Sequence, residues 1–326
     1  MHSISRRGFV ISATTAAAAF GLNGPLEFFT PAFAQKPDPK LTEKGFFKFK
    51  VGDIEVTQVS DGIWEKAHDE KFIKDVTVDQ TKAALKASGL TDAHVPIPFT
   101  VTVIKVKDKY VMFDSGTGAQ GAPTAGLIVK KEMLKAAGID PSKISTIVVT
   151  HYHGDHIFGL MAKDTNAQLF PNAEIIMPEA EYKYWTDAGV FTTLAEPRHG
   201  LAKRIQATFP TWKNIKQIAA GKEALPGVRA VASYGHTPGH TSYLVSSKGK
   251  QLMVLGDVSN VPALNLKNPN WYFFDQDFAV AEASRRKMFD RVVAEKLMVT
   301  GYHFGMPGAG TVSKDGKGYA FVPVKA

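Results

Sequence analysis

The 326-residue chain contains no cysteine. It therefore cannot form disulfide bonds in an oxidising compartment, and it cannot bind a metal ion through a thiolate. Any metal ligand must be a nitrogen or an oxygen atom. The G-x-S-x-G motif of many serine hydrolases is also absent, so the sequence offers no evident serine nucleophile.

The chain also lacks a strong concentration of charge. Its 39 Lys and Arg residues exceed its 31 Asp and Glu residues, giving a net charge of +8, but the excess is spread in short clusters. This distribution is typical of a solvated basic surface rather than of a nucleic-acid-binding groove. An apolar content of 44% and the absence of an internal repeat predict one large domain, which we place at residues 45–326 after a mobile segment at residues 35–44.

The N-terminus has the features of an export signal. The sequence "SRRGFVI" at residues 5–11 resembles a twin-arginine signal, although Ile11 stands where such signals often carry Lys. An uncharged stretch and then "AFA" at residues 32–34 follow it. We predict a signal peptide over residues 1–34 that engages the twin-arginine export machinery, is cleaved after Ala34 and leaves a periplasmic protein with no stable membrane insertion. The alternatives are an ordinary secretion signal and a retained membrane anchor.

Histidine is scarce, yet three of the ten histidines fall within "THYHGDH" at residues 150–156. The spacing H-x-H-x-D-H would arise by chance in roughly one of two thousand sequences of this composition. The preceding run "ISTIVV" at residues 144–149 is apolar and β-branched, which predicts a buried strand ending at the motif.

The spacing within this motif favours a metal site over a polar turn with solvated histidines. In an extended chain His151 and His153 point to the same side and can bind one ion. Gly154 allows a turn that redirects Asp155 and His156, which could hold a second ion close to the first.

Strand-like and helix-like segments alternate along the rest of the chain. Strand character appears at residues 46–62, 99–116, 145–151, 173–178, 227–236, 241–247, 251–257 and 297–303. Helical patterns appear at residues 78–88, 124–137, 178–187, 197–208 and 279–295. This order predicts a mixed α/β fold, and its two strand-rich halves favour two sheets packed face to face with helices outside.

Polar residues at the ends of apolar strands are the natural partners for the histidine motif, because a sheet edge places side chains rigidly. Four strand ends carry such residues: Asp114 in "MFDSG", His236 and His240 in "SYGHTPGH", Asp257 in "VLGD" and His303 in "TGYH".

These motifs together resemble the metallo-β-lactamase superfamily and, within it, the methyl parathion hydrolase group of exported dinuclear hydrolases. The resemblance spans nearly the whole chain after the signal and is carried by "THYHGDHIFGL", "ASYGHTPGHTSYLV", "LMVLGD", "YHFGMPG" and "GKGYAFVPV". It implies an αβ/βα four-layer sandwich with two mixed sheets. It also implies two divalent metal ions, zinc being favoured, with Asp257 bridging a first site of His151, His153 and His236 and a second site of Asp155, His156 and His303.

Further roles follow from the same resemblance. Asp114 would orient a ligand histidine, with a turn-capping role as the alternative, and His240 would bond a ligand or the turn. Trp185 aligns with an aromatic residue that flanks the metals in the methyl parathion hydrolase group. The aromatic stretch "NWYFFDQDF" offers weaker candidates for the pocket wall, namely Trp271, Phe273 and Phe274.

The predicted function is an exported dinuclear hydrolase of small aryl esters, lactones or phosphotriesters, in which a hydroxide bridging two metal ions attacks the substrate and Asp155 and Asp257 are catalytic. Small residues in the loop 114–124, where the methyl parathion hydrolase group can carry a large aromatic, make esters and lactones at least as suitable as phosphotriesters. Cobalt, manganese or iron would also suit these ligands.

Two other functions stay open. One is a β-lactam hydrolase on the same scaffold. The other is a non-catalytic periplasmic metal- or ligand-binding protein, whose metal would be enclosed by protein ligands. Export disfavours a nucleic-acid partner, and the sequence is compatible with a homodimer.

Overall fold

A computed structural model describes residues 39–121 and 124–325 of the chain. The predicted signal peptide lies outside these residues. Of the segment 35–44, the described part forms a short helix, α2 (Pro39–Lys44). Among the helices described, none is both long enough and apolar enough to cross a bilayer.

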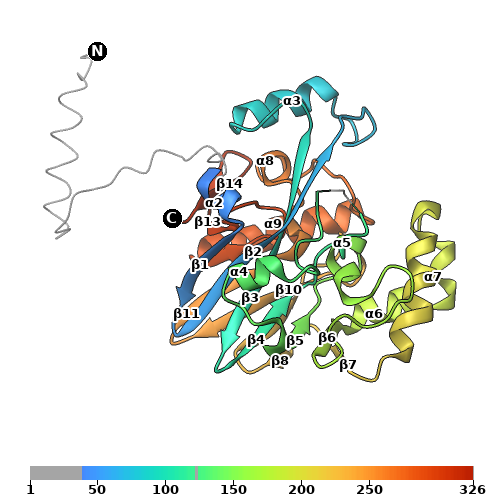
Figure 1. Cartoon of the computed structure of the whole chain (residues 1–326). Coiled ribbons are helices and arrows are strands. Elements are labelled where there is room, and N and C mark those ends of the chain that lie inside the picture. Colours follow the sequence, from blue (N-terminus) through green and yellow to red (C-terminus); the bar gives the residue numbers. More distant parts are fainter. Residues whose placement is uncertain (1–38, 122–123, 326) are drawn as a thin grey trace, which may run out of the picture. The chain divides into compact units, whose positions relative to one another are not determined.

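The described chain forms two seven-stranded mixed sheets (Figure 1). The first sheet contains, in spatial order, β1 (Phe46–Val51), β2 (Ile54–Lys66), β3 (Val95–Val106), β4 (Lys109–Phe113), β5 (Ile144–Val148), β6 (Glu174–Pro178) and β7 (Ile215–Ile218). The second contains β14 (Gly318–Pro323), β13 (Ala309–Asp315), β12 (Met298–Thr300), β11 (Lys250–Val254), β10 (Thr241–Ser247), β9 (Val228–Ala232) and β8 (Glu223–Leu225). Strands β4 to β7 are parallel, as are β11 and β12, and the other neighbours pair antiparallel.

Helices connect the strands. The α-helices after α2 are α3 (Val78–Ala87), α4 (Glu132–Ala136), α5 (Gly154–Ile157), α6 (Glu179–Thr186), α7 (His199–Thr208), α8 (Pro262–Asn265) and α9 (Phe278–Ala294). Short 3-10 helices are η1 (Pro141–Lys143), η2 (Phe158–Leu160), η3 (Ala188–Thr192), η4 (Glu196–Arg198), η5 (Phe209–Thr211) and η6 (Gly256–Val258). The helix predicted at residues 124–137 is shortened to α4, because Gly126 and Lys131 adopt positive φ angles of 99° and 60° that interrupt a right-handed helix.

Side-chain alternation along the strands builds the layers. In β4, Val111 and Phe113 face the second sheet and pack in a core with Tyr243 of β10, whereas Met112 faces the opposite way, into a core shared with α3, α6 and α7. The outer face of the second sheet packs on α9, where Phe289 is fully buried. The order is therefore helices, sheet, sheet, helix, and the predicted αβ/βα sandwich is confirmed.

Candidate metal centre

The polar strand ends converge at one edge of the two sheets. His151 and His153 follow β5 of the first sheet, while His236, Asp257 and His303 follow β9, β11 and β12 of the second. The strands β9, β11 and β12 run in the same direction, so their carboxyl ends share an edge. The site therefore depends on both sheets.

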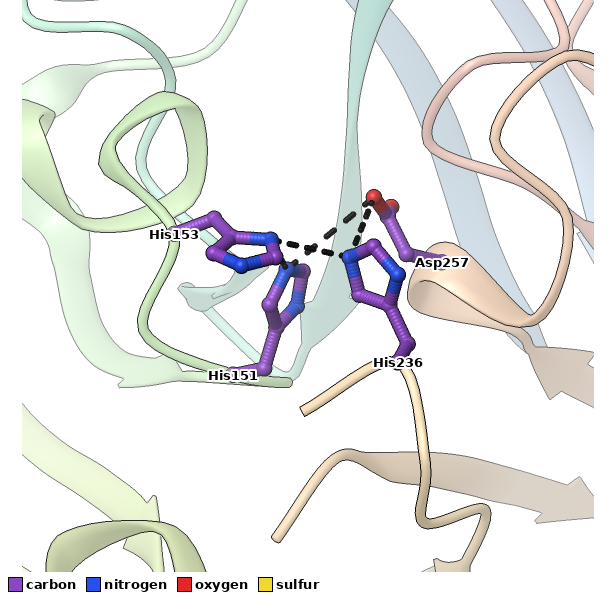
Figure 2. A group of neighbouring side chains, drawn as sticks. All are labelled: His151, His153, His236 and Asp257. Carbon is purple, nitrogen blue, oxygen red and sulfur yellow. Dashed lines mark hydrogen bonds and ion pairs between the residues drawn. The ribbon is translucent and has the colours of Figure 1, made fainter. Parts of the chain in front are cut away.

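Figure 2 shows the first group of side chains, His151, His153, His236 and Asp257, pointing toward one another. The Nδ1 atom of His153 lies 3.0 Å from His151 Nε2 and 2.9 Å from His236 Nε2. Asp257 Oδ2 lies 3.2 Å from His236 Nε2. One ligand atom from each residue lies within 4.8 Å of the others.

Asp155, His156 and His303 form a second group beside the first. Asp155 Oδ2 lies 3.4 Å from His156 Nε2 and 3.5 Å from His303 Nε2. Asp257 also reaches this group, since its Oδ1 lies 3.2 Å from His156 Nε2 and its Oδ2 lies 3.1 Å from His303 Nε2. The carboxylate of Asp257 thus stands between the two groups, in the place expected of a bridging ligand.

The donor set fits two divalent metal ions. Four ligand atoms around a tetrahedral zinc ion would be about 3.3 Å apart, close to the spacings between these atoms. His156 Nε2 and Asp257 Oδ1 are buried and have no hydrogen-bond partner in the described chain, although they face each other across the site. Buried polar atoms are rarely left unpaired, and metal ions between these groups would satisfy both. Nitrogen and carboxylate ligands of this kind favour zinc.

The histidine rings are held from outside the site. In four of the five, the ring nitrogen that faces away from the site contacts a protein oxygen. His151 Nδ1 lies 3.0 Å from Thr150 Oγ1. The Nδ1 atoms of the other three each lie 2.8 Å from their partners, which are Asp114 Oδ2 for His156, Asp275 Oδ1 for His236 and Pro98 O for His303. Such contacts fix the tautomer and the ring orientation, so that the other nitrogen is free to bind a metal.

Asp114 lies where the sequence placed it. Besides His156, its carboxylate accepts hydrogen bonds from the backbone N–H of Thr150 at 2.7 Å and from the Thr150 hydroxyl at 2.8 Å. Asp114 adopts a positive φ of 62°, a conformation that Asp tolerates better than most residues and that these hydrogen bonds maintain. It holds the residue before His151 as well as the His156 ring.

His240 supports Asp257 and does not join either ligand group. The backbone N–H of Asp257 donates to His240 Nε2 at 2.9 Å, and Ser233 Oγ lies 2.8 Å from His240 Nδ1. Burial, aided by the charge of His236, lowers the pKa of His240 to about 3. The ring is therefore neutral and can accept the hydrogen bond that fixes the backbone of Asp257.

The acidic and basic groups of the centre lie close enough to shift one another's pKa values. Burial disfavours a charged His156, but the charges of Asp257, Asp155 and Asp114 outweigh it and raise the pKa of His156 well above its ordinary range. Burial likewise opposes ionisation of Asp257, yet His303 and His156 hold its pKa well below its ordinary range. The site thus concentrates ionised carboxylate around histidines, which suits the binding of cations.

Asp275 was missed in the sequence. Its Oδ1 accepts from His236, and its Oδ2 accepts from Arg285 Nη2 at 2.9 Å. Both Asp275 and Arg285 are buried. The aromatic stretch that contains Asp275 drew attention only as a pocket wall, although an acid within an apolar stretch is itself a sign of a buried partner.

Glu181 was also missed, and it explains the position of Trp185. The fully buried Glu181 carboxylate accepts from the Tyr152 backbone N–H at 2.9 Å, the Gly239 backbone N–H at 2.8 Å, the Thr237 hydroxyl at 2.8 Å and Trp185 Nε1 at 2.7 Å. Burial raises the pKa of Glu181, and these hydrogen bonds oppose the increase. Glu181 therefore ties the loop of His151 and His153 to the loop of His236.

A cavity of about 570 Å³ opens above the ligand groups. Its floor includes His153, Asp155, His236, Asp257 and His303, and its apolar wall consists of Trp64, Ile97, Phe99, Phe158, Leu201 and Phe274. Of the four aromatic residues predicted for the wall, Phe274 lines the cavity. Trp185, Trp271 and Phe273 do not line it; they pack with the core beside the first sheet, where Trp185 and Phe273 are buried and Trp271 is partly buried. Thr117 and Gly121 of the loop 114–124 do line it, as small residues.

Comparison with known proteins identifies the class. Residues 97–296 match the family model of the metallo-beta-lactamase superfamily, and the chain belongs to this superfamily. An N-acyl homoserine lactonase from a Bacillus species is 28% identical over 168 residues, which are 51% of this chain and 58% of that protein. The N-acyl homoserine lactonase AttM of Azorhizobium caulinodans is 31% identical over 118 residues, 34% of this chain and 40% of that protein. The chain thus spans about half the length of such relatives.

Two solved structures resemble the fold over most of its length. The dizinc quorum-quenching lactonase AidC, in complex with the product N-hexanoyl-L-homoserine, has a TM-score of 0.80 and 25% identity, covering 86% of this chain and 98% of AidC. The hydrolase AbOPH of the beta lactamase superfamily has a TM-score of 0.78 and 25% identity, with the same coverage. The predicted superfamily is confirmed. The narrower resemblance to the methyl parathion hydrolase group is not shown by these relatives and stays a prediction.

Proposed function

We propose that the protein is a dinuclear metal-dependent hydrolase that opens lactones and also cleaves aryl esters. The observation that carries this proposal is the pair of ligand groups, linked by Asp257, at the floor of a largely apolar cavity. Relatives named as N-acyl homoserine lactonases, and the dizinc lactonase with a similar fold, support lactones as the first substrates to test.

The chemistry that two divalent ions supply when bound is Lewis acidity, which polarises an acyl oxygen and makes water easier to deprotonate. Asp155 is placed to take the proton of the attacking water, because its side chain lines the cavity and is 28% exposed. Asp257, with a side chain 4% exposed, holds its position between the groups. In the reaction the ring C–O bond breaks, the water oxygen bonds to the acyl carbon, and the proton passes to the leaving oxygen to give a hydroxy acid.

Metal content and hydrolysis measured on the same preparation test this proposal. We expect about two metal equivalents per chain, hydrolysis of γ-lactones and p-nitrophenyl esters, and loss of both after chelation. His151→Ala should lower bound metal and activity together. A protein that holds two metals but turns over no lactone, aryl ester, phosphotriester or cephalosporin would instead be a binding protein.

We also propose that the chain is exported through the twin-arginine route. The proposal rests on the sequence of residues 1–34. It is also supported by the coupling of metal binding to folding, because this route exports folded proteins that have already bound their metal ions. The periplasmic form should begin at Gln35, and replacing Arg6 and Arg7 with Lys should retain the precursor in the cytoplasm. N-terminal sequencing of the periplasmic fraction tests both expectations, and export of the double variant at the normal level would refute the route.

A further inference from the structure

Arg204 of α7 contacts the side chain of Phe158, which belongs to the apolar wall of the cavity. Its guanidinium carbon lies 4.7 Å from the centre of the Phe158 ring. The Arg204 Nε atom donates to Asn166 Oδ1 at 2.7 Å, and its Nη2 atom donates to Ala162 O at 3.1 Å. The Nη1 atom donates to Gln120 Oε1 at 2.7 Å. All three nitrogen atoms are therefore engaged, and they hold the guanidinium in one orientation beside the ring.

Gln120 extends this arrangement to the backbone of the cavity wall. Its Nε2 atom donates to Phe158 O at 3.0 Å and to Met161 O at 2.8 Å. Gln120 directly precedes Gly121, which lines the cavity. Three segments that contribute to the cavity wall, namely the loop segment 114–121, η2 and α7, are thus joined through Arg204 and Gln120.

The partners of the Arg204 guanidinium leave its charge available to the ring. Its three acceptors are neutral amide oxygens rather than carboxylates. Burial lowers the pKa of Arg204, but an arginine side chain remains charged at neutral pH. The face of an aromatic ring attracts a cation, and the attraction is stronger where the cation is removed from water. The Phe158 ring is therefore held by a charge as well as by packing.

The Phe158 ring also lies directly beside the metal-binding motif. A Cβ atom at Gly154 would lie 2.6 Å from Phe158 Cε2, so the ring occupies the space that a side chain at this position would need. Gly154 and Asp155 line the same cavity as Phe158. The position of this ring therefore sets the space that an apolar part of a substrate finds next to Asp155.

We propose that Arg204 is a positioning residue that makes the enzyme selective for the length of the acyl group. It fixes the Phe158 ring and, through Gln120, the loop segment 114–121, and so gives the cavity wall one defined shape. This inference rests on the proposed function and deepens it. Without Arg204 the ring and the loop can take other positions, and the wall accommodates acyl groups of different lengths more equally.

A purely structural role for Arg204 predicts a different result. If Arg204 only stabilised the fold, its loss would lower kcat/KM for every ester by the same factor, and the ratio between esters would stay constant. Loss of the proposed role changes this ratio, because the esters differ only in the part that contacts the wall.

The test is a series of p-nitrophenyl esters from acetate to octanoate, hydrolysed by the metal-loaded protein. In Arg204→Leu, the ratio of the highest to the lowest kcat/KM in the series should shrink about 2- to 30-fold, the factor expected from one cation–π contact. Arg204→Lys keeps a charge near the ring and should retain more of the wild-type ratio. Lys203→Gln removes a charge from an exposed position of the same helix and should leave the ratio unchanged.

A double substitution connects the effect with the Phe158 ring. In a Phe158→Leu background, Arg204→Leu should cause no further change in the ratio, because the ring on which the cation acts is absent. A further change of the full size would assign the effect to another contact of Arg204 and overturn the proposal. An unchanged ratio in the Arg204→Leu single variant would overturn it as well.

Binding provides a measurement that does not need turnover. The linear carboxylates from butyrate to octanoate should bind the metal-loaded wild-type protein with affinities that depend on chain length. Calorimetry should show a weaker dependence in Arg204→Leu at constant metal content, and an equal dependence in both proteins would reject the role of Arg204. Failure of the wild-type protein to hydrolyse any ester of the series would reject the proposed esterase activity, and the calorimetric series would still decide on Arg204.

Discussion

Asp275 offers the sharpest test of how the metal centre is held. Asp275→Asn keeps the size of the side chain but removes the charge that Arg285 and His236 share. Removing one partner of a buried ion pair typically costs 3–5 kcal/mol. Arg285 keeps two other acceptors, Val258 O at 2.7 Å and Pro269 O at 2.8 Å, so we expect the lower end of this range, about 3 kcal/mol.

The same variant should weaken metal binding, because the carboxylate also orients the His236 ring. Loss of such an orienting partner typically lowers metal affinity 10- to 100-fold. Urea unfolding of the metal-free protein measures the stability term, and titration against a competing chelator measures the affinity.

A matched control lies on α9, where Glu282 pairs with Arg286 at the surface at 2.8 Å. Glu282→Gln should change stability by less than about 1 kcal/mol and leave metal affinity as it is. If Asp275→Asn retains wild-type metal affinity, the orientation of His236 does not depend on this carboxylate and the reasoning fails.

Three further substitutions probe other parts of the centre. Asp155→Asn should abolish hydrolysis of p-nitrophenyl esters and lower bound metal measured by mass spectrometry; full activity in a metal-poor variant would contradict its assignment. Glu181→Gln places an amide NH2 group among donors that include the Tyr152 N–H, and it should lower the free energy of unfolding by about 1–3 kcal/mol. Its urea midpoint should therefore lie below that of the wild-type protein. His240→Ala leaves the Asp257 N–H without its acceptor, and we expect a loss of similar size, about 1–3 kcal/mol, together with a lower kcat; unchanged values of both would argue against His240 as the anchor of Asp257.

The ligand positions were accessible to sequence reasoning because each follows a strand. The motif that contains His151 and His153 is local and improbable by chance, and Asp257 and His303 stand directly after apolar runs. Two supporting carboxylates carry a weaker signal than Asp114, which also follows a strand. Asp275 acts on a histidine 39 positions away, and Glu181 lies in a helix where acidic residues are ordinary. Their roles depend on packing between distant segments, which periodicity does not encode.

Trp185 is a residue that sequence reasoning placed in the cavity wall and that packs in the core instead. The resemblance to the methyl parathion hydrolase group predicts Trp185 beside the metals, whereas the structure turns its indole toward Glu181, one helical turn away. The indole N–H of a buried tryptophan needs an acceptor, and Glu181 supplies it. The alignment of one aromatic residue with a family pattern therefore does not indicate whether its ring lines the cavity or packs in the core.

Hydrogen bonds between the two sheets position the metal centre, so its geometry depends on both sheets. The hydroxyl of Tyr243 in β10 donates to Val149 O at 2.8 Å, and the backbone N–H of Thr241 donates to Thr150 O at 3.0 Å. Val149 and Thr150 lead directly into His151, whereas β10 lies between β9 and β11, the strands that precede His236 and Asp257. The first group of ligands is thus positioned by hydrogen bonds across the sheet interface, at the point where the histidine motif begins. Phe113 packs against the Tyr243 ring. Because protein interiors are closely packed, we expect a change at this contact to shift the ligands of the two sheets relative to each other.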